Sequence, residues 1–274
     1  MSFVVLGATS ARAEKAGKIV VSSPPLHSIV SLIAGRPAPT LLASGRESFH
    51  HAALTPSARR AAEEADFFFY GDPEVEPLSA ALLPALPKTV KAASLENDAR
   101  GSHVWMTPEG AAFVAKKTVE TLTERNPDDA KKYRRRYDAF IEKNAELDAF
   151  LTDTLAPVKE APFIVYHDAY ADFAKKYSLN LVGYVTKNPE ASVSGKKMRE
   201  MRRLIAKKKP VCLFVEKGEG EALASALAEG TGTRVAFVNP DGAGMTPGKK
   251  LYPRLMKQLA KDMRACLENT DKVE

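Results

Sequence analysis

Three of the five histidines lie where a strand-like stretch, or the loop after it, meets the start of a helical pattern. They are His50 in Ser-Phe-His-His-Ala, His103 in His-Val-Trp-Met-Thr-Pro and His167 in Val-Tyr-His-Asp-Ala-Tyr. Neutral imidazole is the most common protein ligand of zinc and similar ions. Three imidazoles from distant positions would form a metal site that the whole fold assembles, unlike the local loop of a zinc finger.

The other two histidines have simpler interpretations. His51 follows His50 directly, so the two side chains need not face the same way, and His51 either points to solvent or serves as a fourth ligand. His27 opens the first predicted helix, where we expect it to be exposed or to cap that helix. A lone histidine is more often structural or exposed than a ligand. The metal hypothesis therefore depends on three histidines that share one kind of placement.

Alternating strand and helix patterns position these histidines. Strand patterns cover residues 18–22, 40–43, 66–70, 163–166, 179–185, 211–215 and 234–238, and helical patterns cover 26–34, 56–65, 170–177, 196–208 and 250–267. Pro24-Pro25 is expected to end the first strand. Continuous apolar strands are typical of parallel sheets covered on both faces. We therefore predict an α/β protein with two lobes of mainly parallel sheet flanked by helices.

A long helical pattern separates the two α/β halves. Asn126 is expected to cap it, with Pro127 at its first position, and Pro157 ends it. At 1.5 Å per residue, about 30 residues would span about 45 Å. The predicted organisation is a partial export signal at 1–13, an N-terminal lobe at 18–125, a spine helix at 126–157 and a C-terminal lobe at 158–274. The alternative is a long surface helix of one domain. The three histidines would meet between the lobes, since ligands bind at the carboxyl ends of parallel strands.

Composition excludes some classes of function. The chain has 274 residues, 45% hydrophobic and 27% charged, with a net charge of +6, which is ordinary for a soluble globular protein. Its basic residues are spread along the sequence, with tight runs only at 134–136 and 207–209. This favours a solvated surface over a nucleic-acid interface, which needs a concentrated basic face with interleaved aromatics. No apolar run reaches the roughly 18 residues that a membrane span needs.

The N-terminus and the cysteines favour export. Residues 3–8 are apolar and precede Ala-Arg-Ala at 11–13, which resembles the end of a secretory signal without its basic part; the alternative is a disordered start-site remnant. Cys212 lies in a predicted strand and Cys266 near the end of the last predicted helix. In an exported chain such a pair would form a disulfide between helix and sheet. Two buried free thiols are the alternative.

The segments around the histidines also resemble a known family. They are similar to the zinc-uptake, ZnuA-type substrate-binding proteins of bacterial ABC metal importers, the cluster A-I family. The resemblance lies in the order and spacing of short segments between residues 18 and 268, namely His50 to Pro56 with Ala65-Asp66-Phe67, His103 to Pro108, Asn126-Pro127 with Tyr133, Tyr137 and Leu147, Phe163 to Tyr170, Phe214 to Glu216, Thr231 to Thr233 and Asn239 to Gly242.

The resemblance implies a function and a site. The expected protein is periplasmic, is not an enzyme, and captures Zn²⁺ with His50, His103 and His167. It delivers the ion to an ABC permease in the inner membrane and acts as a monomer. The resemblance further implies a disulfide between Cys212 and Cys266, as in some zinc-type members of the family.

Two positions depart from the family pattern and leave the fourth ligand open. Manganese-type members usually carry an acid where this chain has Asn239, and some zinc-type members carry Glu where it has Phe49. The candidates for the fourth position are His51, Asp241, Asn239 and a water molecule. Three imidazoles without a carboxylate favour zinc over manganese, which prefers oxygen ligands.

Other features refine the expected site. The long His- and Asp-rich loop of many zinc-type members is missing, and only Asp72, Glu74 and Glu76 follow Gly71. Asp168 and Glu216 are candidates for fixing the imidazole tautomers. Because binding needs unprotonated imidazoles, affinity is expected to fall as the pH drops through about 6.5.

Three alternatives compete with zinc capture. A three-histidine zinc with an open position could serve a zinc-dependent hydrolase or lyase, although no H-E-x-x-H motif is present. The chain could instead bind another divalent metal such as Mn²⁺. It could also be a relative without metal binding that acts as an adhesin or scaffold.

Overall fold

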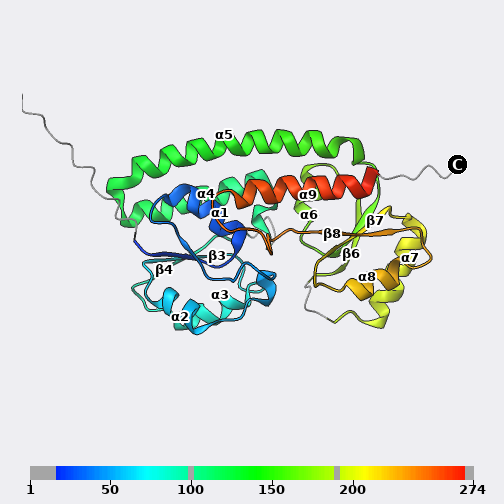
Figure 1. Ribbon diagram of the computed structural model, residues 1–274, viewed down its shortest axis with the longest axis horizontal. Coiled ribbons are helices and arrows are strands. Elements are labelled where there is room, and N and C mark those ends of the chain that lie inside the picture. The colour runs from blue at the N-terminus through cyan, green and yellow to red at the C-terminus, as the bar shows by residue number, and fades with distance from the viewer. Residues whose placement is uncertain (1–16, 98–101, 188–191, 269–274) are drawn as a thin grey trace, which may run out of the picture.

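Two parallel sheets with helices on both faces make up the protein (Figure 1), as the sequence predicts. The computed structural model describes residues 17–97, 102–187 and 192–268. The first sheet has the order β2-β1-β3-β4, formed by β1 Ile19–Val21, β2 Thr40–Leu41, β3 Phe67–Tyr70 and β4 Lys91–Ser94. The second has the order β6-β5-β7-β8, formed by β5 Phe163–His167, β6 Leu181–Thr186, β7 Cys212–Glu216 and β8 Arg234–Val238.

Alternate side chains of each strand pack into two apolar layers, one on each face of the sheet. On β3, Phe67 and Phe69 face one layer and Phe68 faces the other. The first layer is covered by α1 Pro24–Ala34 and α4 Pro108–Arg125, and the second by α2 Pro56–Glu63 and α3 Pro77–Leu82. In the second lobe, α6 Ala171–Lys176 and α9 Leu251–Glu268 lie on one face, and α7 Gly195–Lys208 and α8 Glu221–Ala228 lie on the other. Strands buried on both faces explain the continuous apolar runs.

The long helix α5 Ala130–Leu155 runs along both lobes (Figure 1). It packs on α1 and α4 of the first half and on α9 at the end of the chain. One apolar core continues from β1 and α1 through α5 into β5 and α9. The lobe boundaries at 18–125 and 158–274 stay predictions. The last helix, α9, also packs on α1 of the first half, so the two halves share contacts.

Three local predictions need correction. Residues 127–129 form a 3-10 turn, and Asn126 makes no side-chain cap, so α5 begins at Ala130. Pro24-Pro25 does not precede the first helix but starts α1, because proline suits the first helical positions, whose N–H groups lack partners anyway. His27 is buried, 7% exposed, and its Nε2 lies 3.0 Å from the Pro39 carbonyl oxygen.

The cysteines form the predicted disulfide, which joins β7 to α9 through Cys212 and Cys266. The predicted export signal at 1–13 lies outside the described residues. Within the described ranges, no helix is both long enough and apolar enough to cross a membrane.

Candidate metal centre

The three predicted histidines meet in one buried cluster. His50 lies in a 3-10 turn, Phe49–His51, beyond β2; His103 precedes a second 3-10 turn, Val104–Met106; and His167 is the last residue of β5. One ligand atom from each of them lies within 4.8 Å of the others, which is the one such group of His, Cys, Asp or Glu among the described residues. Their exposures are 2%, 6% and 1%. Both halves of the chain therefore contribute to the cluster.

The spacing of the nitrogens suits a tetrahedral ion. His50 Nε2 and His103 Nε2 are 3.2 Å apart. Zinc binds imidazole at about 2.0–2.1 Å, so two ligand nitrogens of a tetrahedral site lie about 3.3 Å apart. The ring of His167 lies edge-on to the other two, with ring centroids 5.1 Å from that of His50 and 4.9 Å from that of His103. The arrangement can hold a divalent ion with three nitrogens.

A glycine allows the His103 turn to lie against α4. A Cβ atom on Gly110 would sit 1.7 Å from the Val104 carbonyl oxygen, so only glycine fits there. Thr107 caps α4 by accepting a hydrogen bond from the Gly110 N–H at 3.1 Å. The Trp105 indole donates to the Pro240 carbonyl at 2.9 Å and so ties this turn to the loop after β8.

The short acidic loop 72–76 supports two of the histidines. The Val75 carbonyl lies 2.9 Å from His50 Nδ1, so it accepts the proton there and leaves Nε2 free to bind a cation. Asp72 accepts a hydrogen bond from the Ser102 hydroxyl, next to His103, at 2.7 Å. Buried Glu76 accepts from the Gly71 N–H and the Ser79 hydroxyl at 3.0 and 2.7 Å. In the sequence, these acids were noted only as the residues that stand in place of a longer loop. Nothing in the sequence reveals their hydrogen-bond partners.

Glu216 holds the third histidine. Its Oε1 lies 3.1 Å from His167 Nδ1 and also accepts a hydrogen bond from the Tyr170 hydroxyl at 3.2 Å. When ionised, Glu216 accepts the Nδ1 proton and leaves Nε2 of His167 free for a metal. The predicted role of Glu216 in fixing a tautomer therefore agrees with the geometry. Asp168 makes no hydrogen bond to His167 among the described contacts; its Oδ1 is buried without a partner.

Burial keeps these groups neutral. Burial, and then the charge of His167, lower the pKa of His50. Burial, and then the charges of the other two histidines, hold the pKa of His103 well below its usual range. Burial lowers the pKa of His167 to about 4 and raises that of Glu216 to about 8, the latter with help from Asp241. At neutral pH the three imidazoles are thus uncharged, so no imidazolium charge repels an incoming cation.

The structure places the candidates for the fourth position differently. His51 Nε2 lies 2.5 Å from Glu219 Oε1, so this imidazole contacts the second lobe. Asn239 binds within its own loop, donating to the Ala243 carbonyl and accepting from the Gly242 N–H at 2.9 and 2.7 Å. Asp241 is 3% exposed, and no described group forms a hydrogen bond with its Oδ2.

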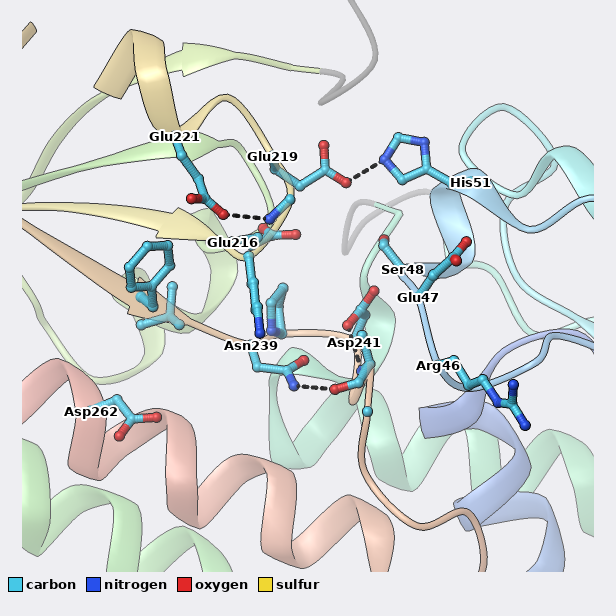
Figure 2. A pocket seen from close by; sticks show the side chains of 17 residues that line it. Arg46, Glu47, Ser48, His51, Glu216, Glu219, Glu221, Asn239, Asp241 and Asp262 are labelled. Atoms are coloured by element: carbon cyan, nitrogen blue, oxygen red, sulfur yellow. Dashed lines mark hydrogen bonds and ion pairs between the residues drawn. The ribbon is translucent and has the colours of Figure 1, made fainter. Parts of the chain in front are cut away.

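An open pocket of about 700 Å³ lies beside the histidine cluster. We call it the outer pocket; Glu47, His51, Glu216, Glu219 and Asp241 line it. Figure 2 shows His51 and Glu219 reaching towards each other from opposite sides of this pocket. Gly220 has φ +64°, and a Cβ there would meet the Tyr166 ring at 2.0 Å, so glycine lets the Glu219 loop approach β5. Sequence reasoning missed Glu219, because its partner is 168 residues away.

The match to a protein family covers nearly all of the chain. The family described as zinc-uptake complex component A, periplasmic, matches residues 19–266. This chain belongs to that family. Family members are metal-binding transport components. The predicted resemblance is therefore confirmed.

Relatives of the zinc-uptake family span most of the chain. It is 28% identical to the high-affinity zinc uptake system protein ZnuA of Brucella abortus strain 2308, over 91% of this chain and 91% of that protein. It is 33% identical to the ZnuA of Paracoccus denitrificans, over 60% of this chain and 51% of that one.

Solved structures agree in fold. A crystal structure of ZnuA has a TM-score of 0.76 at 21% identity, covering 90% of this chain and 98% of the other. A mutant structure of the laminin-binding adhesin Lmb from Streptococcus agalactiae has a TM-score of 0.77 at 20% identity, covering 92% and 100%. At this level of identity the likeness supports the two-lobed architecture alone. The function has to be argued from the family match and from the site.

Proposed function

We propose that the protein is a periplasmic binding protein that captures Zn²⁺ with His50, His103 and His167 and delivers it to an ABC permease of the inner membrane. The observation that carries this proposal is the buried cluster of three imidazoles with their ligand atoms within 4.8 Å of one another. Membership of the zinc-uptake family supports it. The lobes at 18–125 and 158–274, joined by the spine at 126–157, would hold the ion between them.

The donor set favours zinc as the cargo. Three neutral nitrogens suit a borderline-soft ion, whereas Mn²⁺ prefers carboxylates and water. Asn239 stands where manganese-type members usually carry an acid, and its amide forms hydrogen bonds within its own loop. We assign the fourth position to a water or to Oδ2 of Asp241, which has no described partner. His51 and Asn239 are engaged elsewhere.

Transport, and not catalysis, is the proposed role, carried out by a monomer. A zinc hydrolase needs a positioned general base beside the metal-bound water. Among the described residues, Glu216 is the carboxyl group that forms a hydrogen bond with one of the three histidines, and it is held by His167 and Tyr170. In that position Glu216 orients the imidazole of His167 and does not act as a general base for a metal-bound water.

A competitive metal titration tests the proposal. Protein purified without a histidine tag would be titrated with Zn²⁺ and Mn²⁺ against a chromophoric chelator, with elemental analysis of the purified protein. One Zn²⁺ per chain, bound far more tightly than Mn²⁺, is the expected result. Equal affinity for Mn²⁺ would contradict the assignment of the cargo. Ester or CO₂ hydrolysis by the zinc-loaded protein above background would contradict the assignment to transport.

A further inference from the structure

The segment formed by helix α7 and Lys209, the residue that follows it, carries more positive charge than the whole protein. Residues 195–209 contain eight Lys or Arg against one acid, Glu200, a formal charge of +7. The complete chain has a net charge of +6, so all other residues together amount to −1. The net positive charge of the chain is therefore matched by that of this one segment. This revises the expectation that the basic residues are spread along the chain with tight runs only at 134–136 and 207–209.

Most of these cations are exposed, and no acidic partner for them lies among the described residues. Seven of the eight are exposed, namely Lys196, Arg199, Arg202, Arg203, Lys207, Lys208 and Lys209, while half-buried Lys197 lies over the Tyr184 ring at 4.9 Å. In the part of the chain that the structure describes, none of the eight forms an ion pair. The face is therefore free to attract an external anion.

Part of the arrangement costs the helix stability, although Lys207 and Lys208 in the last turn suit its dipole. Lys196 and Lys197 lie in the first turn, where the helix dipole disfavours positive charge, and that turn holds no acid. Arg199 and Arg203 are four residues apart, as are Arg203 and Lys207, so like charges repel along one side. Sequences that break local rules in this way often do so for function. An anionic surface would remove both penalties at once.

The chemistry of the face favours lipid over protein as the partner. Met201 and Ile205 bury the apolar side of α7 against its own lobe, so the outer side offers charge alone. The large hydrophobic side chain that is exposed in the described residues is Phe237, on β8. Protein interfaces usually need an aromatic or apolar centre. Polybasic faces without one bind anionic bilayers by diffuse attraction and do not insert.

We propose that α7 docks the protein reversibly on a membrane rich in anionic phospholipid. The helix lies at the end of the molecule opposite the first sheet (Figure 1), and none of its residues lines the outer pocket. The biological use of this docking rests on the proposed function, because a carrier held at the inner-membrane surface searches two dimensions for its permease. The binding itself needs only the face of α7.

Vesicle co-sedimentation tests the docking surface. Intact protein would be mixed with phosphatidylglycerol–phosphatidylethanolamine vesicles or with phosphatidylcholine vesicles, at low and at high salt. The test variant combines Arg199→Gln, Arg202→Gln, Arg203→Gln and Lys207→Gln. A control removes the same charge from exposed sites elsewhere through Lys131→Gln, Arg134→Gln, Arg135→Gln and Lys249→Gln.

The expected result is binding of the native protein to the anionic vesicles only, lost at high salt, because electrostatic adsorption is screened. The α7 variant should bind at least about tenfold more weakly, given the typical contribution of each basic residue at an anionic surface. The control should stay within about twofold. Binding to phosphatidylcholine, or equal losses in both variants, would overturn the proposal.

Two further measurements keep the outcomes separate. Zinc titration of the α7 variant should match that of the native protein, which shows that the variant is folded and that metal capture does not depend on α7. Native protein that binds zinc but ignores anionic vesicles refutes lipid docking and leaves metal capture intact. Retention by permease reconstituted in phosphatidylcholine, without any lipid binding, would assign α7 to an acidic protein face instead.

Discussion

His50 and His51 are neighbours in the chain but belong to different regions of the protein. The His50 side chain is buried among two other imidazoles, whereas that of His51 is 41% exposed and meets Glu219 at the outer pocket. The central region is buried and uncharged, and hydrogen bonds hold the Nδ1 atoms of His50 and His167. The outer region is open and rich in carboxylates. We call the cluster of His50, His103 and His167 the centre, and the contact of His51 with Glu219 the rim. The centre is placed to bind the ion, and the rim connects the two lobes.

The largest expected effect comes from removing the central imidazoles. The triple variant His50→Ala, His103→Ala, His167→Ala should bind Zn²⁺ at least about 1,000-fold more weakly, because no nitrogen ligand remains. Competitive titration would measure the loss, and circular dichroism would verify folding. His27→Ala is the matched control, since His27 is also buried but contacts Pro39 and not the cluster. Zinc affinity retained by the triple variant would show that the centre is not the metal site.

Removing the charge that supports the centre should have a smaller effect. Glu216→Gln should weaken zinc binding by about 10–100-fold, because it no longer enforces the His167 tautomer. The pKa of Glu216 is raised to about 8, so the carboxyl is mostly protonated at pH 7 before a cation binds. Zinc should then displace about one proton. Calorimetry in buffers of different ionisation enthalpy should detect that proton in the native protein and not in the variant.

The pH dependence should distinguish buried from exposed imidazole. Burial lowers the pKa values of the three histidines, that of His167 to about 4, so protons compete with zinc for the imidazoles only at acidic pH. The expectation from sequence, a fall through about 6.5, should be corrected downwards, because solvated imidazole sets that value. Affinity should fall by at most about tenfold between pH 7.5 and 6.5, because zinc displaces the Glu216 proton, and should drop more steeply towards pH 4, where the imidazoles also take up protons. A midpoint at 6.5 would indicate that the cluster is open to solvent before it binds metal.

The smallest effect on affinity should come from the rim. His51→Ala and Glu219→Gln should each change the zinc dissociation constant by less than about threefold, because neither side chain is needed for ligation. Each should speed release, since the contact between the two lobes at 2.5 Å is lost. Stopped-flow transfer to a chelator measures that rate, and the double variant should add little, as expected for one shared contact. A loss of affinity as large as that of the triple histidine variant would remove the distinction between centre and rim.

The fold and the central histidines could be predicted from the sequence because each produces a pattern within a short segment. Apolar runs mark strands buried on both faces, and each of the three histidines follows or precedes such an element. Pairings between distant segments leave no such mark. Nothing near Glu219 indicates His51, and nothing near Val75 indicates that its carbonyl supports His50.

Composition misled in a different way. The basic residues were expected to form a solvated surface with tight runs only at 134–136 and 207–209, whereas a count over residues 195–209, which are α7 and Lys209, shows a concentrated charge of +7. Likewise, His27 was expected at the surface because it opens a helix, but the loop that returns to β2 covers it with the Pro39 carbonyl. Burial of a helix start depends on what packs over it, which periodicity alone does not encode.

The apolar core that passes through α5 and α9 has a thermodynamic consequence. Because that core includes side chains from both sheets, neither lobe can lose its packing without exposing part of the other's. The two lobes should therefore melt together, as a single cooperative unit, although the molecule has two sheets. Bound zinc would then raise the melting temperature of the entire chain and not of one half.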